Sequence, residues 1–376
     1  MRVRVTTIGL AAGLAVISLA ATPFIASAAP KIKAIGGHTI PGKAYAEGVA
    51  CPPGTPVTKS DCVVVGNTQA GANAVARVHH GKPGAFNALA PGGSSVTCPN
   101  ATTCVIGGAE TLSTAPGGVI GTVQWIGPGG PIATVTVDGT SDVTGVGCTS
   151  PTVCVASGYF NGKSTATGTK QYGEIANVTE STLTAHAHRV AKTDQLSGVS
   201  CDANDSCVVV GFGGPTSKTH GLIIVVKHGK VGAARTAPGA GQLNDVSCGS
   251  STTCWATGEH LSAKKGVLEV VSEVHNGKPL HARTSPQGSG AISCVSSTTC
   301  YLAGGKARGK NGQSSTGEVF RLVKGHVKAT TIIAHTMGFS GISCPVSTSC
   351  IVTGPQTFHN PGVDSYWRSD EVVLKV

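Results

Sequence analysis

The chain has 376 residues, with 53 glycines, 14 cysteines, 12% charged residues and a formal net charge of +10. Val and Thr are abundant and runs of helix-favouring residues are missing, which argues against a helical bundle and favours an all-β chain. Beyond the N-terminal segment, no stretch approaches the roughly 20 apolar residues that a membrane-spanning helix needs.

The N-terminus has the pattern of a secretory signal peptide, which we assign to residues 1–28. Arg2 and Arg4 supply a basic start, residues 8–21 form an apolar core, and residues 26–28 are a small-residue cleavage site. The apolar core is short for a membrane span. The mature chain, residues 29–376, then forms one domain with a net charge of +8, in the extracellular space or at the cell envelope.

One short motif recurs seven times and accounts for all fourteen cysteines. In each copy a β-branched aliphatic residue stands two positions before the first cysteine, and glycine stands four positions after the second. Six pairs enclose five residues, the first pair encloses ten, and the first cysteines recur every 46–53 residues. The pairs are Cys51/Cys62, Cys98/Cys104, Cys148/Cys154, Cys201/Cys207, Cys248/Cys254, Cys294/Cys300 and Cys344/Cys350. A period of this length is the signature of a repeat architecture.

Paired cysteines in an exported chain predict disulfides, one within each repeat. The alternative, half of a zinc site, fits less well because zinc sites favour two to four intervening residues. Each bridge closes a small loop, which the chain-entropy model values at about 2 kcal/mol.

Each repeat has room for four short strands, a to d. In the fourth repeat, strand a ends at Cys201, and residues 207–210, 221–226 and 231–236 follow as strands b, c and d. X-Gly turns between such runs are the signal of a two-residue hairpin. Histidines that we assign to equivalent turns between strands c and d are His79, His80, His228, His275 and His326.

Four-stranded antiparallel units repeated radially make a propeller, so seven copies predict seven blades. An open solenoid would need capping repeats, and none is visible. The seventh repeat ends after its third strand, whereas residues 31–40 form a spare strand before the first repeat. We expect this N-terminal segment, within residues 31–45, to complete the last blade and remove an open sheet edge.

The repeats, written Val-Ser-Cys-x5-Cys-x3-Gly, resemble those of secreted bacterial propellers of the BNR/YVTN/WD40-like superfamily over all seven units. The resemblance implies a fold and no particular activity. The chain departs from enzymatic members, since the Asp-box Ser-x-Asp-x-Gly-x-x-Trp is absent, as are the paired Gly-His and Trp-Asp signatures of WD repeats.

The sequence assembles no recognisable catalytic centre, so we favour a non-catalytic protein. It has no Gly-x-Ser-x-Gly elbow and no phosphate loop. The alternative is a sialidase-like glycoside hydrolase or lyase, but Arg77, Arg235 and Arg321 fall on or beside outer strands. Two carboxylates, or three arginines, at the mouth of the central channel would favour the enzyme, and we expect neither.

Metal and cofactor sites are also not expected. His186 and His188 alternate along one expected strand and would point the same way, but no third ligand is evident. We predict no metal site and no cofactor. Trp125 and Trp255 are expected in the core between blades.

A blade of this kind places its a–b and c–d turns on one face and its b–c and d–a loops on the other; we call these the turn face and the loop face. Variable loops on a rigid scaffold commonly bind ligands. Aromatic rings beside basic and amide groups suit a glycan or an acidic partner. The candidate ligand-binding residues, all expected on the loop face, are Tyr159, Asn161, Glu259, His260, Arg308, Lys310, His359, Trp367 and Arg368.

We therefore expect a secreted binding scaffold whose extracellular or envelope ligand is a glycan, an anionic polymer or a protein. The basic net charge is compatible with an anionic polymer. We expect a monomer without a nucleic-acid partner, because the chain has no basic stripe.

Overall fold

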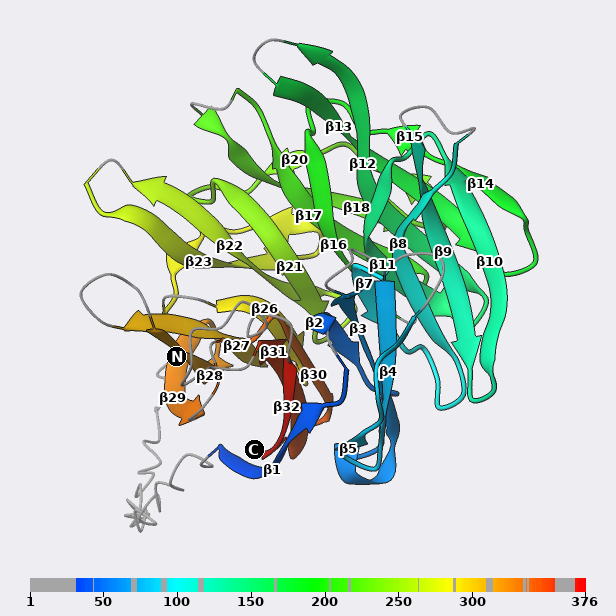
Figure 1. The fold of residues 1–376 in the computed structure, drawn as a ribbon. Helices are drawn as coiled ribbons and strands as arrows, with labels where there is room; N and C mark the ends of the chain where they lie inside the picture. The colour runs from blue at the N-terminus through cyan, green and yellow to red at the C-terminus, as the bar shows by residue number, and fades with distance from the viewer. Residues whose placement is uncertain are drawn as a thin grey trace, which may run out of the picture. The chain divides into compact units, whose positions relative to one another are not determined.

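The computed structural model describes residues 32–42, 44–68, 73–88, 93–113, 118–165, 168–202, 204–215, 218–262, 264–286, 289–308, 314–333, 336, 338–355 and 369–376. The assigned signal peptide lies outside these residues. Residues 31–376 form one compact unit of seven sheets that follow one another around an axis (Figure 1). In the part of the chain so described, no helix is long and apolar enough to cross a membrane.

Each sheet is one blade whose strands run from strand a, beside the axis, to the outer strand d. Blade 1 contains β2 (Ala44–Ala50), β3 (Asp61–Thr68), β4 (Asn73–His79), β5 (Lys82–Pro83) and β6 (Asn87–Ala88), with the 3-10 turn η1 (Val57–Lys59) between its first two strands. Blade 2 contains β7 (Ser95–Thr97), β8 (Cys104–Thr111), β9 (Val119–Gly127) and β10 (Gly130–Asp138), and β14 (Thr184–His186) adds a parallel outer strand to its sheet. Blade 3 contains β11 (Asp142–Ser150), β12 (Val153–Thr165), β13 (Gly168–Thr179) and β15 (His188–Arg189).

The other four blades repeat this plan. Blade 4 contains β16 (Gln195–Asp202), β17 (Ser206–Gly213), β18 (His220–Lys227), β19 (Lys230–Val231) and β20 (Arg235–Thr236). Blade 5 contains β21 (Gln242–Cys248), β22 (Thr253–Ser262), β23 (Gly266–His275), β24 (Lys278–Pro279) and β25 (Arg283–Thr284). Blade 6 contains β26 (Ser289–Cys294), β27 (Thr299–Arg308), β28 (Ser314–Val323) and β29 (His326–Ile333). Blade 7 contains β30 (Gly341–Val346), β31 (Ser349–Pro355), β32 (Ser369–Lys375) and the N-terminal β1 (Lys33–Ile40).

The closure predicted from the spare N-terminal strand is confirmed. β1 pairs antiparallel with β32, from Lys33 opposite Lys375 to Ile40 opposite Ser369. Figure 1 shows the blue β1 close to the C-terminus and the red β32. The closing strand ends at Ile40, and Ala44 already belongs to blade 1, so the closing element is shorter than residues 31–45.

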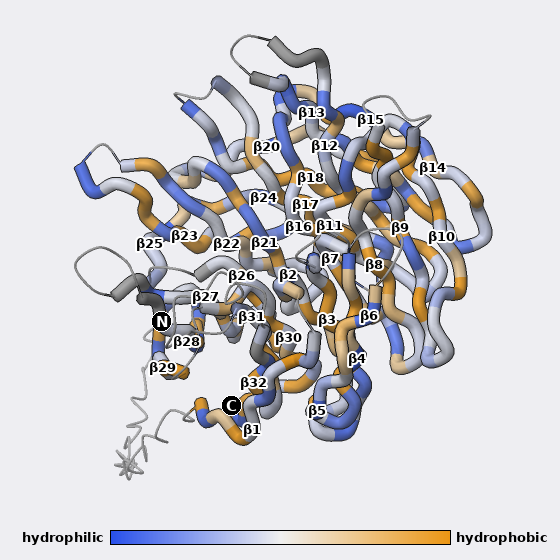
Figure 2. The backbone as a smooth tube through the Cα atoms, viewed as in Figure 1, coloured by the Kyte–Doolittle hydropathy of each residue, from blue (hydrophilic) through white to orange (hydrophobic). Residues whose placement is uncertain are grey.

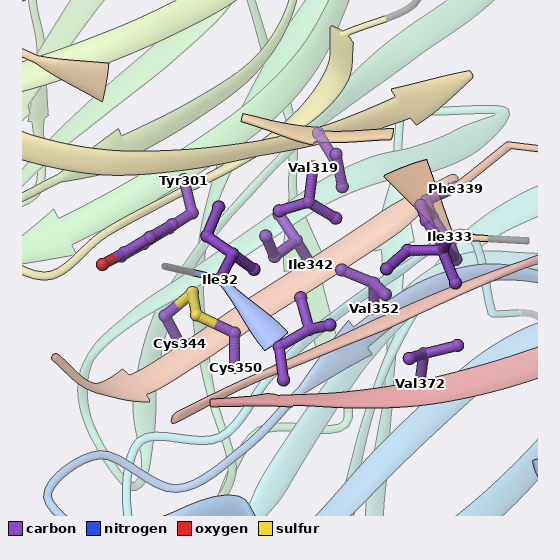
Figure 3. Packing of buried hydrophobic residues seen from close by; sticks show 13 residues of the cluster. Ile32, Tyr301, Val319, Ile333, Phe339, Ile342, Cys344, Cys350, Val352 and Val372 are labelled. Atoms are coloured by element: carbon purple, nitrogen blue, oxygen red, sulfur yellow. A yellow bond between two sulfur atoms is a disulfide. The ribbon is translucent and has the colours of Figure 1, made fainter. Parts of the chain in front are cut away.

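The core is divided into seven clusters of buried apolar side chains, one between each pair of adjacent blades. Figure 3 shows the cluster between blades 6 and 7, where Tyr301 and Val319 pack with Val352, Val372 and the disulfide of blade 7. Figure 2 shows hydrophobic residues running along the strands of the blades. Because both faces of a blade are buried, the inner strands read as nearly continuous apolar runs.

The two tryptophans expected in the core lie there. Trp125 is fully buried between blades 2 and 3, and Trp255 is buried between blades 5 and 6. Each indole N–H donates to a carbonyl in the a–b turn of the next blade, Trp125 to Pro151 at 2.9 Å and Trp255 to Ser297 at 3.0 Å. A buried indole therefore has its donor satisfied while it also joins two blades.

All seven predicted disulfides are formed, one within each blade between strands a and b. The bridges are Cys51–Cys62, Cys98–Cys104, Cys148–Cys154, Cys201–Cys207, Cys248–Cys254, Cys294–Cys300 and Cys344–Cys350. No cysteine remains free. This density of disulfides indicates an oxidising compartment.

The second cysteine of each bridge lies inside the core, because strand b is packed against both neighbouring blades. Five of these residues have a relative exposure of 1% or less: Cys62, Cys154, Cys207, Cys300 and Cys350. Each belongs to one of the clusters between adjacent blades. These five cysteines therefore have a structural role, because a ligand cannot reach their buried sulfur atoms. The zinc alternative also fails for them, since an oxidised cysteine is not a thiolate ligand.

In blades 1, 3, 4 and 5, the glycine four positions after the second cysteine is explained by a β-bulge in strand a. In blade 5, Leu243 lies opposite Gly258 and Asp245 opposite Thr257, so Asn244 is an extra residue without a partner. A Cβ atom on Gly258 would lie 2.0 Å from the carbonyl oxygen of Gln242. The same conflict, at 1.8–2.2 Å, occurs at four other repeat glycines: Gly66, Gly158, Gly211 and Gly354. Glycine is therefore required because the bulged strand approaches too closely for any side chain.

Candidate functional site: the central cavity and the loop face

The seven a strands enclose a central cavity of about 910 Å³. Its lining repeats with the sequence period, and positions are best counted back from the first cysteine of each blade. The residues two positions before that cysteine form an aliphatic ring around the cavity: Val49, Val96, Val146, Val199, Val246, Ile292 and Ile342. The β-branched residues noted in the sequence thus line the cavity in every blade.

A second ring is polar and is produced by the bulges. The extra residue of each bulged strand, four positions before the first cysteine, lies in the cavity lining together with its counterparts in blades 2 and 7. This bulge ring consists of Glu47, Ser94, Thr144, Ser197, Asn244, Gly290 and Ser340. Sequence analysis missed it, because only the repeat glycine opposite the bulge signalled its presence.

The cavity extends to the turn face. Its lining includes six of the seven first cysteines and residues of the a–b turns such as Pro53, Thr149 and Pro345. The turn face therefore also borders the central cavity.

Two buried carboxylates on strands a of different blades are coupled electrostatically, and one of them lines the cavity. Glu47 belongs to the bulge ring of blade 1, and Asp142 is the first residue of strand a in blade 3. Burial, reinforced by the negative charge of Glu47, raises the pKa of Asp142 to about 6. Burial also raises the pKa of Glu47, whose Oε1 accepts a hydrogen bond of 2.5 Å from Asn67.

Two tyrosines border this pair. Burial, and then the charge of Glu47, raises the pKa of Tyr45. Burial, and then the charge of Asp142, raises the pKa of Tyr159. Both phenols consequently stay protonated, and can donate hydrogen bonds, above their ordinary range.

A third cavity-lining carboxylate, Asp245, has a structural role. It lies in blade 5 next to the bulge, and burial raises its pKa to about 6. Its Oδ1 accepts from the N–H of Val246 at 2.8 Å, and its Oδ2 accepts from the N–H of Ile292 in blade 6 at 2.9 Å. Both oxygens are thus hydrogen-bonded, and the bond from Ile292 joins blade 5 to blade 6.

The candidate ligand residues on the loop face lie in strands where they are described, and the prediction that they lie in loops is wrong. Tyr159 and Asn161 belong to β12, Glu259 and His260 to β22, and Arg308 ends β27. Strands b and c of these blades continue as two-stranded ribbons, and in blade 5 the register runs on to Ser262 opposite Gly266. Four candidates fall outside the described residues: Lys310, His359, Trp367 and Arg368.

Blade 3 carries an aromatic and cationic cluster at its b–c ribbon. Phe160 lies opposite Tyr172 in the sheet register. The Arg189 guanidinium lies 3.9 Å from the ring centroid of Tyr172 and 6.0 Å from that of Phe160. The Lys170 ammonium lies 5.1 Å from the same tyrosine ring. Sequence analysis singled out Tyr159 and Asn161 beside this cluster but missed Tyr172 and Arg189, because only strand pairing brings them together.

The outer arginines do not gather at the cavity. Arg77, Arg235 and Arg283 each donate to a backbone carbonyl in or beside the c–d turn of the next blade, at Gly127, Gly277 and Lys324 respectively. Arg189 instead interacts with Glu174 at 3.4 Å. Among the described residues, these arginines therefore join blades or brace one blade, and they form no triad for a substrate carboxylate.

Of the five histidines assigned to equivalent turns, two share one turn position, whereas His79 and His275 end strand c and His326 begins strand d. His80 and His228 occupy the first turn position with φ of 50° and 49°, as do Asn276 and Lys324 in blades 5 and 6. The prediction that His186 and His188 alternate along one strand is wrong. His186 ends β14 (Thr184–His186), which pairs in parallel with β10 of blade 2, whereas His188 starts β15 of blade 3. The chain crosses between two blades at Ala187, whose N–H donates to Asp138 of blade 2.

The chain matches no protein-family model and no curated protein. Solved structures are similar over most of its length. The structure of U3-55K has a TM-score of 0.61 at 7% identity, covering 92% of this chain and 98% of that one. The WD40 domain of Toxoplasma gondii coronin has a TM-score of 0.55 at 10% identity, covering 92% and 88% respectively. A protein of unknown function from Dyadobacter fermentans has a TM-score of 0.53 at 10% identity, covering 93% and 100%. At these identities the likeness concerns the fold alone, which is a seven-bladed β-propeller with WD40-like structural neighbours.

Proposed function

We propose that this protein is a secreted, non-catalytic propeller of the bacterial BNR/YVTN/WD40-like kind that binds an extracellular or envelope ligand on its loop face. The fold is typical of WD40-like interaction scaffolds. Seven disulfides and the signal-like N-terminus support export. The contact residues of the proposal are the loop-face candidates Tyr159, Asn161, Glu259, His260, Arg308, Lys310, His359, Trp367 and Arg368, joined by Phe160, Lys170, Tyr172 and Arg189.

The observation that carries the proposal is the cluster on the b–c ribbon of blade 3. Tyr172 and Phe160 are partly exposed rings, and Lys170 and Asn161 are exposed beside them. The Arg189 side chain remains 51% exposed although it stacks on Tyr172. Rings offer a flat apolar surface to sugar rings, and the two cations and the amide offer charge and hydrogen bonds to acidic substituents.

Of the ligand classes considered, this chemistry favours an acidic glycan or a related anionic envelope polymer. The cluster is basic and belongs to a mature chain with a net charge of +8. A protein partner would call for a larger continuous apolar surface, and exposed apolar residues of the loop face, such as Leu261 and Val267, lie on a different blade.

The test is a binding array of acidic and neutral glycans and isolated cell-wall polymers, probed with the oxidised mature chain, residues 29–376. Binding to acidic members should fall about 3- to 30-fold in Tyr172→Leu and in Lys170→Ala, which corresponds to the usual strength of a cation–π or aromatic contact. It should also weaken as salt is added. Lys230→Ala, at an exposed lysine of a c–d turn, is the matched control and should bind normally. Equal binding by all variants, or recognition of a protein alone, would overturn the glycan assignment.

The hydrolase alternative has one observation in its favour, the interacting pair Glu47 and Asp142. Two carboxylates flanking a bond are what glycoside hydrolysis requires. The described arginines do not gather at this pair, and the sialidase-like reading is not favoured. Incubation of the wild type with the glycans of the same array decides the question. Release of sugar that disappears in Glu47→Gln would show that the protein is an enzyme.

A further inference from the structure

A group of three metal-binding side chains lies at the c–d turn of blade 1. Asp61 is in β3, His79 ends β4 and His80 follows in the turn. One ligand atom from each residue lies within 4.8 Å of the other two. We propose that Asp61, His79 and His80 bind a late first-row divalent metal ion such as Zn²⁺.

The backbone fixes this arrangement. Asp61 and His79 are directly opposite in the β3–β4 register, and Asp61 Oδ1 lies 2.5 Å from His79 Nδ1. His80 has a φ of 50° and is followed by Gly81 with a φ of 76°, so the chain makes a tight turn. The N–H of His80 donates to the carbonyl of Ser60 at 3.0 Å, which holds the turn against the start of β3.

The two imidazoles lie on the same side of this turn. Their ring centroids are 4.0 Å apart with an interplanar angle of 20°. The ligand atoms of the three residues lie within 4.8 Å of one another, and a bound ion would replace the direct contact between Asp61 and His79. The side chains of His79 and Asp61 are 70% and 45% exposed, so an ion can enter without opening the fold.

The donor set indicates the class of ion. Two imidazoles and one carboxylate suit Zn²⁺, Cu²⁺ or Ni²⁺ better than Ca²⁺ or Mg²⁺, which prefer an all-oxygen set. Three protein ligands leave at least one coordination position for water or an external group, as in open zinc sites.

The repeat supplies an internal comparison. At the equivalent positions blade 5 has Thr253, His275 and Asn276, with the Thr253 hydroxyl 3.3 Å from His275 Nδ1. Asn276 has a φ of 49°, nearly that of His80, so the two turns share one backbone conformation. Blade 5 therefore has the geometry of the site with only one of its three ligands.

The experiment is calorimetric titration of ZnCl₂ into the oxidised, untagged mature chain. The wild type should bind one ion tightly. The variant Asp61→Thr with His80→Asn gives blade 1 the residues of blade 5 and removes two ligands. Zinc affinity should therefore fall by more than roughly 10-fold, which is the loss usually seen when only a residue that supports a ligand is mutated. The metal-free variant should unfold at the wild-type temperature, because Asn already occupies this turn conformation in blade 5.

A reciprocal variant tests sufficiency. Thr253→Asp with Asn276→His places the complete ligand set on blade 5 and should add a second ion of similar affinity. The proposal is overturned if the wild type binds Zn²⁺ no more tightly than the Asp61→Thr, His80→Asn variant, or if the blade 5 variant, folded and tested alongside a binding wild type, gains no site. The proposal is independent of the loop-face function, since this turn lies on the turn face.

Discussion

The side-chain hydroxyl of Ser247 accepts a hydrogen bond of 2.9 Å from the backbone N–H of Cys294, and so joins blade 5 to blade 6. The same bond recurs at three other interfaces between blades. In each, the serine that precedes the first cysteine of one blade accepts from the N–H of the first cysteine of the next blade: Ser200 from Cys248, Ser293 from Cys344 and Ser343 from Cys51. The serine of the Val-Ser-Cys motif is therefore a contact between blades, and the cysteine beside it is fixed in two directions, by its disulfide and by this bond.

Removing this hydroxyl should lower stability. Ser247→Ala and Ser293→Ala should each reduce the free energy of unfolding by about 0.5–1.5 kcal/mol, the usual worth of one hydrogen bond. Chemical denaturation of the oxidised protein measures the change. Thr97→Ala is the control, since the described residues show no bond from the Thr97 hydroxyl to the N–H of Cys148. A loss in Thr97→Ala as large as in the serine variants would contradict the assignment.

The repeat glycine should tolerate no side chain. Gly258→Ala places a Cβ atom 2.0 Å from the Gln242 carbonyl oxygen and 2.7 Å from the Leu243 Cα. Because both obstacles are backbone, the strand must move, and we expect a loss of at least about 1–3 kcal/mol. Gly290→Ala, with no atom within 4 Å of its added Cβ, should change the unfolding free energy by less than about 0.5 kcal/mol. Equal effects of the two variants would show that the bulge is not the constraint.

Closure of the ring should depend on the buried end of β1. Ile40 is fully buried, whereas Ile35 in the same strand is 50% exposed. Ile40→Ala should cost about 2–5 kcal/mol, as large apolar truncations in a core do. Ile35→Ala should cost less than about 0.5 kcal/mol. Thermal unfolding of both variants makes the comparison, and a small effect at Ile40 would mean that β1 contributes little to closure.

Glu371 should make the protein less stable as pH rises. It is fully buried, neither carboxylate oxygen has a hydrogen-bond partner among the described residues, and burial raises its pKa to about 8. The folded state therefore holds a proton that the unfolded state releases above about pH 4.3. Stability attributable to Glu371 is highest below that pH, falls by up to about 1.4 kcal/mol per pH unit, and stops falling above about pH 8.

Glu371→Gln isolates this effect, because glutamine keeps the shape and cannot ionise. The difference in unfolding free energy between variant and wild type should grow from pH 6 to pH 8 in favour of the variant. That window lies above the pKa of about 6 to which burial raises both Asp142 and Asp245. A difference that stays constant across the window would rule out the shifted pKa.

The repeat motif was sufficient to predict the blades, the seven disulfides and the N-terminal closure, because each depends on residues that recur at fixed spacing. It was not sufficient for contacts made between repeats. Glu47 and Asp142 come from blades 1 and 3, and Arg189 reaches Tyr172 only through the pairing of β13 with β15. The crossing of the chain at Ala187 could not be predicted from the sequence either. The residues from Thr184 to Arg189 read as one strand, whereas the structure divides them between blade 2 and blade 3.

The loop residues were misassigned for a related reason. His260 and Asn161 stand near the beginning of largely polar stretches that interrupt the apolar pattern, which is the usual sign of a loop. In the structure each of these stretches belongs to strand b and pairs with strand c of its own blade. The resulting two-stranded ribbon extends beyond the body of the blade, where a strand needs no apolar face.

The bulges have a consequence for how such a protein can diversify. The bulged residues are outside the hydrogen-bond ladder, so exchanging their side chains leaves the register and the disulfides unchanged. Contacts between blades are affected at Thr144 and at Ser340, whose hydroxyls donate to the carbonyls of Leu196 and Ala46 in the next blade. Among the described residues, no hydrogen bond joins the side chains at Ser94, Ser197 or Asn244 to a neighbouring blade, and Gly290 has no side chain. These four positions around the cavity can thus be varied independently. Combinatorial mutagenesis of these positions would therefore change the size, polarity or charge of the central cavity while the blades keep their structure.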